Sequence, residues 1–567
     1  TLSGRVRFDD SYTKATDKRY AGTLGNLSDN SERGYYGETN YKEKQIFADF
    51  LASFNKDFSE DWNLQANFGG SINDMRYEST DIRGGIPDGS ENYPGQDALL
   101  TNFFSINNIS RNAPKTWNMW REQTQSIYAS ADLGYKRTYY LTLTGRNDWP
   151  SALAGVNSKK SSFFYPSVGI SVLMTQLFED AGLNIPSEYL SFWKIRASWA
   201  SVGTAFPRYI ANPRYEWVNG TWSVLTQYPV NNLLPERTKS WEVGMNFRFL
   251  KDFNFDATWY QADTYNQTFN PNVPVGKYSK IYVQTGKIRN WGMEFALGFD
   301  HTWNNFSWAS NMTYSFNKNV IKELGRNAYN PVTGEKLDID QLVMTDNQVG
   351  ATRFILREGG TMGDLYSMVD LQRDHNGNIY INPEGNVSTV SVADKPIKLG
   401  SVLPKGNLAW SNSFTWKNLT ASFMLSARFG GVVYSRTQAV LDYYGVSEAS
   451  ADARDLGYVL VNGKDKVNPE TWYGVVGSGT AVPQYYTYSA TNVRLQEVSL
   501  GYTIPKKLLN DVCDIKVSLV GRNLWMIYSK APFDPESVAS TDNFYQGIDY
   551  FMMPALRNIG FSLSFKF

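Results

Sequence analysis

The stretch Asn418-Leu419-Thr420-Ala421-Ser422-Phe423-Met424-Leu425-Ser426-Ala427-Arg428-Phe429 alternates between two kinds of side chain. Every odd-numbered position is apolar, whereas the even-numbered positions carry Thr420, Ser422, Met424, Ser426 and Arg428. Successive side chains of a β-strand point to opposite faces, so this alternation predicts a strand with one apolar face and one more polar face.

The same alternation recurs along the whole chain. Ile515, Val517 and Leu519 oppose Lys516, Ser518 and Arg522, and Phe561, Leu563, Phe565 and Phe567 oppose Gly560, Ser562, Ser564 and Lys566. Counting such segments predicts about 16 strands. They are residues 1–9, 43–55, 61–75, 122–135, 138–148, 163–175, 191–203, 237–249, 253–266, 286–301, 305–319, 403–416, 418–432, 490–504, 513–527 and 555–567. A tilted strand crosses a bilayer in about 9–11 residues, so segments of this kind can span a membrane.

The connections between these segments alternate between long and short. The short ones include residues 56–60, 136–137, 251–252 and 303–305, whereas the longest is 320–402. Outer-membrane barrels have short turns at the periplasmic end and long loops outside the cell. The sequence therefore predicts an all-β, antiparallel transmembrane barrel.

The composition is more typical of a membrane barrel than of a nucleic-acid-binding or disulfide-bonded domain. The 567 residues carry 55 basic and 55 acidic side chains and are 15% aromatic, with one cysteine. A balanced charge gives no electrostatic footprint for nucleic acid, and Cys513 alone cannot form a disulfide within the chain. No run approaches the roughly 18 apolar residues of a membrane helix, so we expect the chain to contact outer-membrane lipid through its strands.

Aromatic residues gather where the two membrane interfaces should lie. Examples are Trp62, Tyr135, Tyr139, Phe253, Phe255, Trp259 and Trp416. Rings at these depths form the girdles of outer-membrane barrels. Phe567 completes an alternating strand at the end of the chain and resembles the C-terminal signal by which such barrels are recognised for assembly.

Several phrases resemble the SusC/RagA family of TonB-dependent outer-membrane transporters, the glycan and peptide importers of Bacteroidetes. They are Gly145-Arg146-Asn147-Asp148-Trp149-Pro150-Ser151, Phe164-Tyr165-Pro166-Ser167-Val168-Gly169, Lys194-Ile195-Arg196-Ala197-Ser198-Trp199-Ala200, Leu234-Pro235-Glu236-Arg237-Thr238-Lys239-Ser240-Trp241-Glu242-Val243-Gly244, Asn290-Trp291-Gly292-Met293-Glu294, Arg494-Leu495-Gln496-Glu497-Val498-Ser499-Leu500-Gly501-Tyr502-Thr503-Ile504-Pro505, Gly521-Arg522-Asn523-Leu524 and Asp534-Pro535-Glu536. They follow the family's order over nearly the whole chain.

The resemblance implies a barrel of 22 strands filled by an N-terminal plug. It also implies a periplasmic segment contacted by the TonB complex and a SusD-like surface lipoprotein over the mouth. Residues 1–567 would then be a partial barrel, without the plug, the TonB-contacting segment and roughly six early strands. We expect that remaining N-terminal portion of the same transporter as a separate chain or fragment.

Catalytic and cofactor patterns are missing from the sequence. There is no H-E-x-x-H, no G-x-S-x-G and no phosphate-binding loop, so we expect no catalytic residue, no metal and no cofactor. The turn at Asp374-His375-Asn376-Gly377-Asn378 resembles part of a calcium loop, but Ile379 stands where a glycine should follow and Gly385 where a bidentate glutamate should lie. An ordinary Asn-Gly turn is the favoured interpretation, with calcium as the alternative.

Ligand contacts in such a transporter should come from aromatic and polar side chains at the lumen or mouth. The candidates are Asp148, Trp149, Trp222, Tyr443 and Tyr444, each with an alternative role in a girdle, a loop core or a lipoprotein contact. Loops 320–402 and 433–489 are long enough to form the lipoprotein platform, or to pack only on themselves.

Three functions are compatible with these features. The first is TonB-dependent import of oligosaccharides or oligopeptides with a lipoprotein partner. The second is a passive porin or structural barrel, which an even strand count also fits. The third is a soluble all-β carbohydrate-binding protein or hydrolase, which the alternating loop lengths disfavour.

Overall fold

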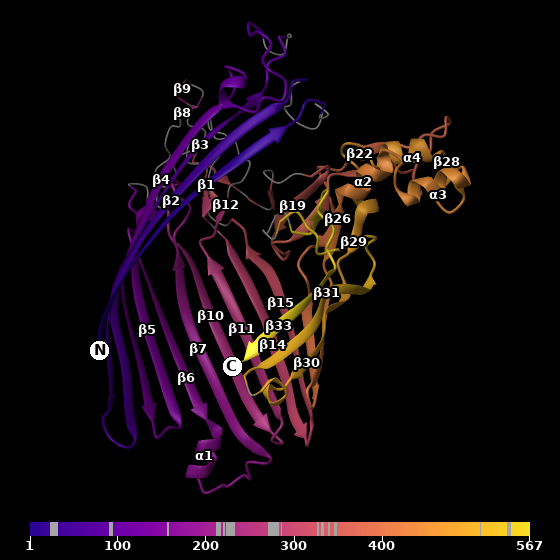
Figure 1. Ribbon diagram of the computed structural model, residues 1–567. Coiled ribbons are helices and arrows are strands. Elements are labelled where there is room, and N and C mark those ends of the chain that lie inside the picture. The colour runs from indigo at the N-terminus through magenta and orange to yellow at the C-terminus, as the bar shows by residue number, and fades with distance from the viewer. Residues whose placement is uncertain are drawn as a thin grey trace.

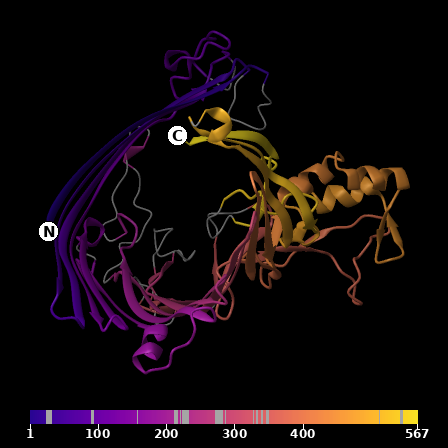
Figure 2. The ribbon, with the colours of Figure 1, turned by 60° about the horizontal axis from the view of Figure 1, so that its bottom comes forward.

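A single 16-stranded antiparallel sheet curves around a central space and forms most of the molecule (Figures 1 and 2). The computed structural model describes residues 1–22, 32–89, 94–155, 158–210, 217–218, 221–222, 233–269, 283–284, 286–325, 328–329, 334–337, 339, 341–344, 349–510, 512–540 and 546–566. Each strand of the large sheet pairs with its neighbour in chain order. This up-and-down order is the topology of a transmembrane barrel.

The strands of this sheet are β1 (Leu2–Arg19), β2 (Tyr35–Asp57), β3 (Trp62–Gly85), β4 (Lys115–Tyr135), β5 (Tyr139–Pro150), β6 (Phe163–Leu173), β7 (Leu190–Thr204), β10 (Glu236–Phe249), β11 (Phe253–Tyr265), β14 (Lys287–Trp303), β15 (Phe306–Glu323), β24 (Gly406–Trp416), β25 (Leu419–Phe429), β30 (Asn492–Ile504), β31 (Asp514–Ser529) and β33 (Asn558–Lys566). Every predicted segment corresponds to one of them, in order, which confirms the predicted architecture.

The largest difference from the prediction is the length of the first four strands at their extracellular ends: β1, expected over residues 1–9, continues to Arg19, and β2, β3 and β4 are longer by a similar amount. The segments 43–55, 61–75 and 122–135 were expected, but these strands reach Tyr35, Gly85 and Lys115. Both faces of a strand outside the lipid contact water, so its sequence no longer alternates although backbone pairing continues. Figure 1 shows these extensions as a tall hairpin group above the wall.

Short turns and long loops lie at opposite ends of the sheet, as predicted. The connection from β6 to β7 is an exception in length, because it contains the helix α1 (Met174–Asp180) at the end where the short turns lie. Among the described residues, no helix is long and apolar enough to cross a membrane.

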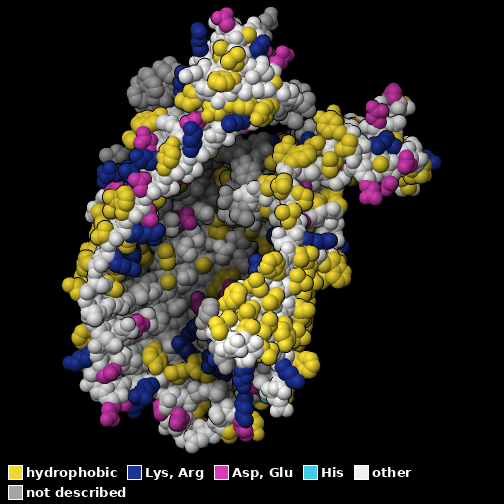
Figure 3. Space-filling view, in the orientation of Figure 1, with side chains coloured by type: hydrophobic (Ala, Val, Ile, Leu, Met, Phe, Trp, Pro, Cys, Tyr) yellow, Lys and Arg dark blue, Asp and Glu magenta, His cyan; other side chains and the backbone are white. Residues whose placement is uncertain are grey.

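The strand register joins the separately predicted apolar faces into continuous rows. Ala421 pairs with Phe414 on one side and with Leu500 on the other, and Leu500 pairs with Leu519, which pairs with Phe561. Directly paired residues share a face, so this row crosses five strands without a polar side chain. Figure 3 shows the resulting apolar patch over β31 and β33. This face is the outer, lipid-facing side of the wall.

The two edges of the sheet are β1 and β33, each with a single neighbour in the described structure. Figure 2 shows the opening between these edges in an otherwise curved wall. An unpaired strand edge in hydrocarbon leaves backbone N–H and C=O groups without hydrogen bonds, which is costly.

An extracellular lobe stands beside the mouth and is built mainly from the loops that follow β15 and β25. It contains β18 (Gln341–Val343), β19 (Thr352–Arg357), β20 (Asp364–Ser367), β21 (Val369–Leu371), β22 (Thr389–Ser391), β23 (Ile397–Ser401), β26 (Val432–Ser435), α2 (Arg436–Tyr443), α3 (Glu448–Leu456), β27 (Val459–Val461), β28 (Asp465–Val467), α4 (Pro469–Val476), β29 (Thr487–Ser489) and β32 (Ile548–Asp549). Smaller pairs elsewhere are β8 (Trp217–Val218) with β9 (Thr221–Trp222), β12 (Thr268–Phe269) with β13 (Val283–Gln284), and β16 (Ala328–Tyr329) with β17 (Lys336–Leu337).

One hydrophobic core joins the segments of the lobe. Phe354, Leu365, Tyr434, Trp472 and Ile548 are buried together in it, although they come from three different loops. A second cluster packs Ile288 and Ile321 of the wall against Leu342, Leu356 and Met362 of the lobe. The lobe is therefore an ordered body seated on β14 and β15.

Candidate functional site

The inner face of the wall carries polar and charged side chains, opposite in register to the apolar rows. Asp148 of β5 lies on this face and is 9% exposed. Its carboxylate accepts a hydrogen bond from Arg146 Nε at 2.7 Å and one from the Tyr165 hydroxyl of β6. Arg146 also donates to Ser126 Oγ of β4 at 2.8 Å and lies over the ring of Tyr128. This network ties three strands together across the lumen surface.

Trp149 lies on the other face of the wall from Asp148. The two are consecutive in β5, and consecutive residues of a strand point to opposite faces. Trp149 pairs with Gln125 and is 40% exposed on the lipid side, at the extracellular edge of the apolar rows. Asp148 and Trp149 therefore lie on opposite faces of the wall, and Trp149 has the position of a girdle residue, which is one of the alternative roles expected for it.

A second lumen network centres on Arg196 of β7. Its guanidinium donates to Asn246 Oδ1 at 2.7 Å and to Thr258 Oγ1 at 2.6 Å, on β10 and β11. The guanidinium crosses β10 over Gly244, where an added Cβ would lie 2.8 Å from the Arg196 side chain. Gly244 is thus needed because a side chain there would occupy the place of the arginine.

Tyr443 and Tyr444 end α2 in the lobe. They are 46% and 71% exposed, and their rings make an edge contact with centroids 5.0 Å apart. The helices of the lobe project sideways, outside the ring of strands, in Figure 2. This position suits contact with another protein better than contact with material in the lumen.

The remaining candidates are only partly described or serve a local role. The backbone of Trp222 pairs with Trp217 in a two-residue strand, but its side chain lies outside the described residues, as does Phe567. Asp374 Oδ1 accepts hydrogen bonds from the backbone N–H groups of Asn376 and Asn378, at 2.8 and 2.9 Å, and Gly377 has φ +83°. This is the geometry of the favoured Asn-Gly turn, with the carboxylate satisfied by the turn itself.

Metal ligands do not gather in the described part of the chain. There, no group of three His, Cys, Asp or Glu side chains is placed to hold an ion. The inner face instead carries paired charges and amides, of which the Arg196 and Arg146 networks were not predicted. Both arginines lie within the quoted phrases, but a single sequence gives no partner for a side chain whose contacts lie on neighbouring strands.

Comparison with known proteins agrees with this architecture. A model described as "TonB dependent receptor-like, beta-barrel" matches residues 1–524. The chain belongs to this family of TonB-dependent receptors. As a TonB-dependent receptor barrel it is an outer-membrane protein, which excludes the soluble carbohydrate-binding protein or hydrolase considered above.

Two curated TonB-dependent receptors illustrate the relationship. TonB-dependent receptor P3 of Formosa agariphila is 24% identical over 523 residues, which cover 84% of this chain and 49% of the relative. TonB-dependent receptor SusC of Bacteroides thetaiotaomicron is 23% identical over 410 residues, which cover 68% of this chain and 38% of the relative. The chain thus spans about half or less of the length of these relatives.

The fold of this TonB-dependent receptor is also seen in solved structures. The RagAB peptide importer in its open-open state superimposes with a TM-score of 0.74 at 16% identity, covering all of this chain and 59% of the other. The predicted SusC/RagA resemblance is therefore confirmed.

Proposed function

We propose that this chain is the greater part of the barrel of a TonB-dependent importer, which carries oligosaccharides or oligopeptides across the outer membrane together with a SusD-like lipoprotein. The observation that carries the proposal is the combination of a polar, hydrogen-bonded lumen wall with a separate ordered lobe at the extracellular end. On this proposal the chain binds and passes cargo and performs no catalysis.

The lumen wall supports passage of a polar cargo. Arg146, Asp148, Arg196 and Asp256 all lie on the inner face, where they are paired with one another or with amides and hydroxyls. Paired charges and amides offer many hydrogen-bonding groups without a strong net field. Such a surface suits glycans and peptides, which are rich in hydroxyl and amide groups.

The lobe supports docking of a lipoprotein. Five large side chains of the lobe are each more than 45% exposed. They are Tyr443 of α2, Tyr444 and Val446 of the turn after α2, Leu456 of α3 and Leu460 of β27. Exposed apolar patches on an ordered body mark protein interaction sites. RagAB, whose importer shares this fold, is described as a peptide importer.

The two sheet edges support completion of the wall by other strands. We propose that the remaining N-terminal portion of the same transporter supplies roughly six strands between β1 and β33, the plug, and the segment that the TonB complex contacts. The passive alternative, a porin, has no plug and needs no energy from the inner membrane.

Uptake by the complete transporter distinguishes these functions. Cells that carry it with its lipoprotein should accumulate labelled oligosaccharide or oligopeptide only while TonB and the proton gradient are intact. Uptake that continues at the same rate without TonB would support the porin instead.

Lipoprotein docking has its own test. Replacing Tyr443 and Tyr444 together with Ser should lower the lipoprotein recovered with the purified transporter. Tyr189→Ser is the control, because Tyr189 is 59% exposed at the opposite end of the wall. Equal recovery from both variants and the native protein would exclude this patch as the docking surface.

A further inference from the structure

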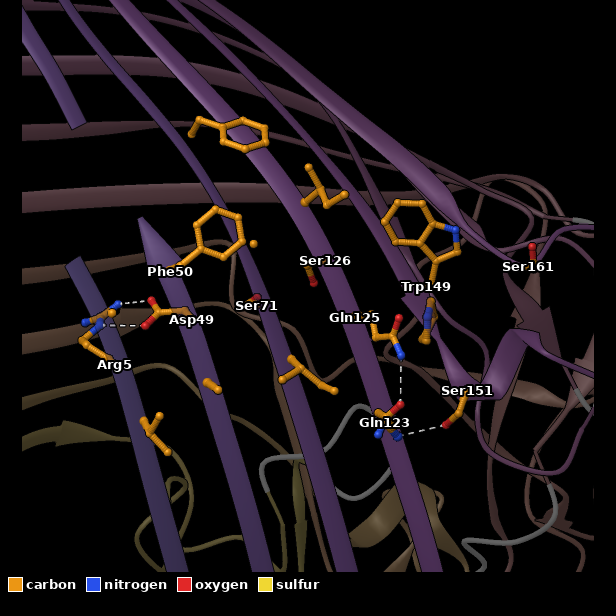
Figure 4. A pocket seen from close by; sticks show the side chains of 18 of the residues that line it. Arg5, Asp49, Phe50, Ser71, Gln123, Gln125, Ser126, Trp149, Ser151 and Ser161 are labelled. Carbon is orange, nitrogen blue, oxygen red and sulfur yellow. Dashed lines mark hydrogen bonds and ion pairs between the residues drawn. The ribbon is translucent and has the colours of Figure 1, made fainter. Parts of the chain in front are cut away.

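An apolar groove of about 1160 Å³ crosses the outer face of β1 to β5. Figure 4 shows Phe50 and Trp149 on opposite sides of it. Most of its lining side chains share the outward register, among them Val6, Phe68, Ile72 and Ile127. The groove therefore opens toward the bilayer and not toward the lumen.

Small residues make the floor of the groove. Gly4, Ala48 and Gly70 lie on three neighbouring strands, whereas the flanking positions carry the rings of Phe50 and Trp149. Gly4 and Gly70 each pair with Phe50, and Ala48 pairs with Ile72, so small and large side chains alternate across the strands and leave a depression beside the rings. A depression of this volume in a lipid-facing surface has room for acyl chains.

The extracellular end of the groove is joined to a cluster of charges. Gln123 lines the groove, and its Nε2 donates to Asp74 Oδ2 at 2.9 Å. The same carboxylate accepts from Arg121 Nη2 at 2.6 Å and from Arg76 Nε at 3.1 Å. Asp74 thus fixes two guanidinium groups beside the end of the groove.

These arginines belong to a row that crosses four strands. Asp10 pairs with Lys44, Lys44 with Arg76, and Arg76 with Arg121. Both arginine side chains are 57% exposed and Lys44 is 40% exposed, so they can still contact an anion. The three cations of this row have two acidic partners, Asp10 and Asp74, so the net charge of the cluster is positive.

The height of this row matches the headgroup level of the outer leaflet. On β3, the outward register changes from apolar to charged directly after Ile72, where Asp74 and then Arg76 follow toward the extracellular end. Trp149 marks the same boundary on β5. A fixed pair of guanidinium groups directly above an apolar groove is complementary to an amphiphile with a phosphate headgroup.

We propose that this groove and the row Lys44–Arg76–Arg121 form a binding site for a phosphorylated glycolipid of the outer leaflet. An acyl chain lies between Phe50 and Trp149, and a phosphate of the headgroup accepts hydrogen bonds from Arg76 and Arg121. The site would anchor the extended hairpins β1–β4 to the surrounding leaflet.

Titration of the complete transporter with diphosphorylated lipid A, followed by native mass spectrometry, tests the headgroup contact. Removing both guanidinium groups in the Arg76→Gln, Arg121→Gln variant should weaken binding by at least about tenfold. The matched control is Arg7→Gln, Arg83→Gln, which removes two arginines paired with neighbouring carboxylates on the lumen face of β1 and β3. Lipid A without phosphates should bind the native protein as weakly as diphosphorylated lipid A binds the first variant.

The groove itself is tested by Gly4→Leu. A Cβ at Gly4 would meet its nearest atom, the backbone oxygen of Asp49, at an ordinary 3.8 Å, so the wall tolerates the change while the side chain enters the groove. Binding of diphosphorylated lipid A should fall at least about fivefold. Equal loss in the lumen-face control, no preference for phosphate, or a change in the number of transporter copies without loss of lipid would overturn the proposal. The last result would make the groove an interface between copies of the protein.

Discussion

Arg494 of β30 and Asp534 of the last extracellular loop form an ion pair in which Nη2 lies 2.7 Å from Oδ1. Their side chains are 6% and 15% exposed, and Arg494 also reaches Glu536 at 3.2 Å and Asn523 at 2.8 Å. Two phrases that are far apart in the sequence, one beginning at Arg494 and the other at Asp534, are therefore in contact. The pair fastens the loop that follows β31 to the wall.

Replacing Arg494 with Met should destabilise the folded barrel by about 2–3 kcal/mol, because Asp534 is left buried without its counter-charge. Urea-induced unfolding in detergent micelles measures this loss. Arg522→Met is the control, since its pair with Glu497 is largely exposed, with 67% and 36% exposed side chains, and should contribute less than about 1 kcal/mol. Equal losses in the two variants would contradict the role of burial.

Replacing Leu519 with Arg should lower the amount of folded protein in the outer membrane. Leu519 is 59% exposed in the apolar row that joins Leu500 to Phe561, and a cation near the middle of the bilayer costs about 2–4 kcal/mol. Ser518→Arg places the same charge on the lumen face one residue away. If both variants assemble equally well, the assignment of the two faces is incorrect.

The Arg196 network predicts a non-additive pair of substitutions. Gly244→Ala should displace the guanidinium from Asn246 and Thr258, and Arg196→Met removes the same hydrogen bonds. Each single variant should therefore lower the free energy of unfolding by about 1–2 kcal/mol. The double variant should cost little more than either single one, as a double-mutant cycle on unfolding free energies will show. Gly169→Ala is the control, because an added Cβ there meets its nearest atom at 3.7 Å. Fully additive losses would mean that Gly244 serves another purpose.

The lobe should loosen at strongly alkaline pH. Burial raises the pKa of Tyr434 to about 12, from an ordinary value near 10 in the unfolded chain. Both states are neutral at this residue below about pH 10, so its contribution to stability is then complete. Between about pH 10 and 12 the unfolded chain ionises first, and the contribution is lost as pH rises. Native-state proteolysis of the lobe as a function of pH measures the effect, and Tyr434→Phe should reduce it. A pH dependence unchanged in that variant would assign the effect to other groups.

The candidate site was predictable only in part. Asp148 was a candidate because it lies in a recognisable phrase at the end of a strand, but its hydrogen bond with Tyr165 depends on the register between β5 and β6. Asp148 and Trp149 were both candidates for ligand contact, and the pairing of β5 with β4 places them on opposite faces of the wall. The lobe core could not be predicted, because Phe354, Tyr434 and Ile548 meet across loops that show no periodic pattern.

The sequence by itself determined the sixteen strands, their order and the apolar face of those with the clearest alternation, because a period of two is a local property that the two solvents impose on a strand. It also determined the family, through phrases spread along the chain. Only the tertiary structure decided which charges meet in the lumen, how the long loops share one core, and that small residues and two arginines on neighbouring strands form a groove beneath a basic row. These depend on register between strands, and register is fixed by contacts between residues far apart in the chain.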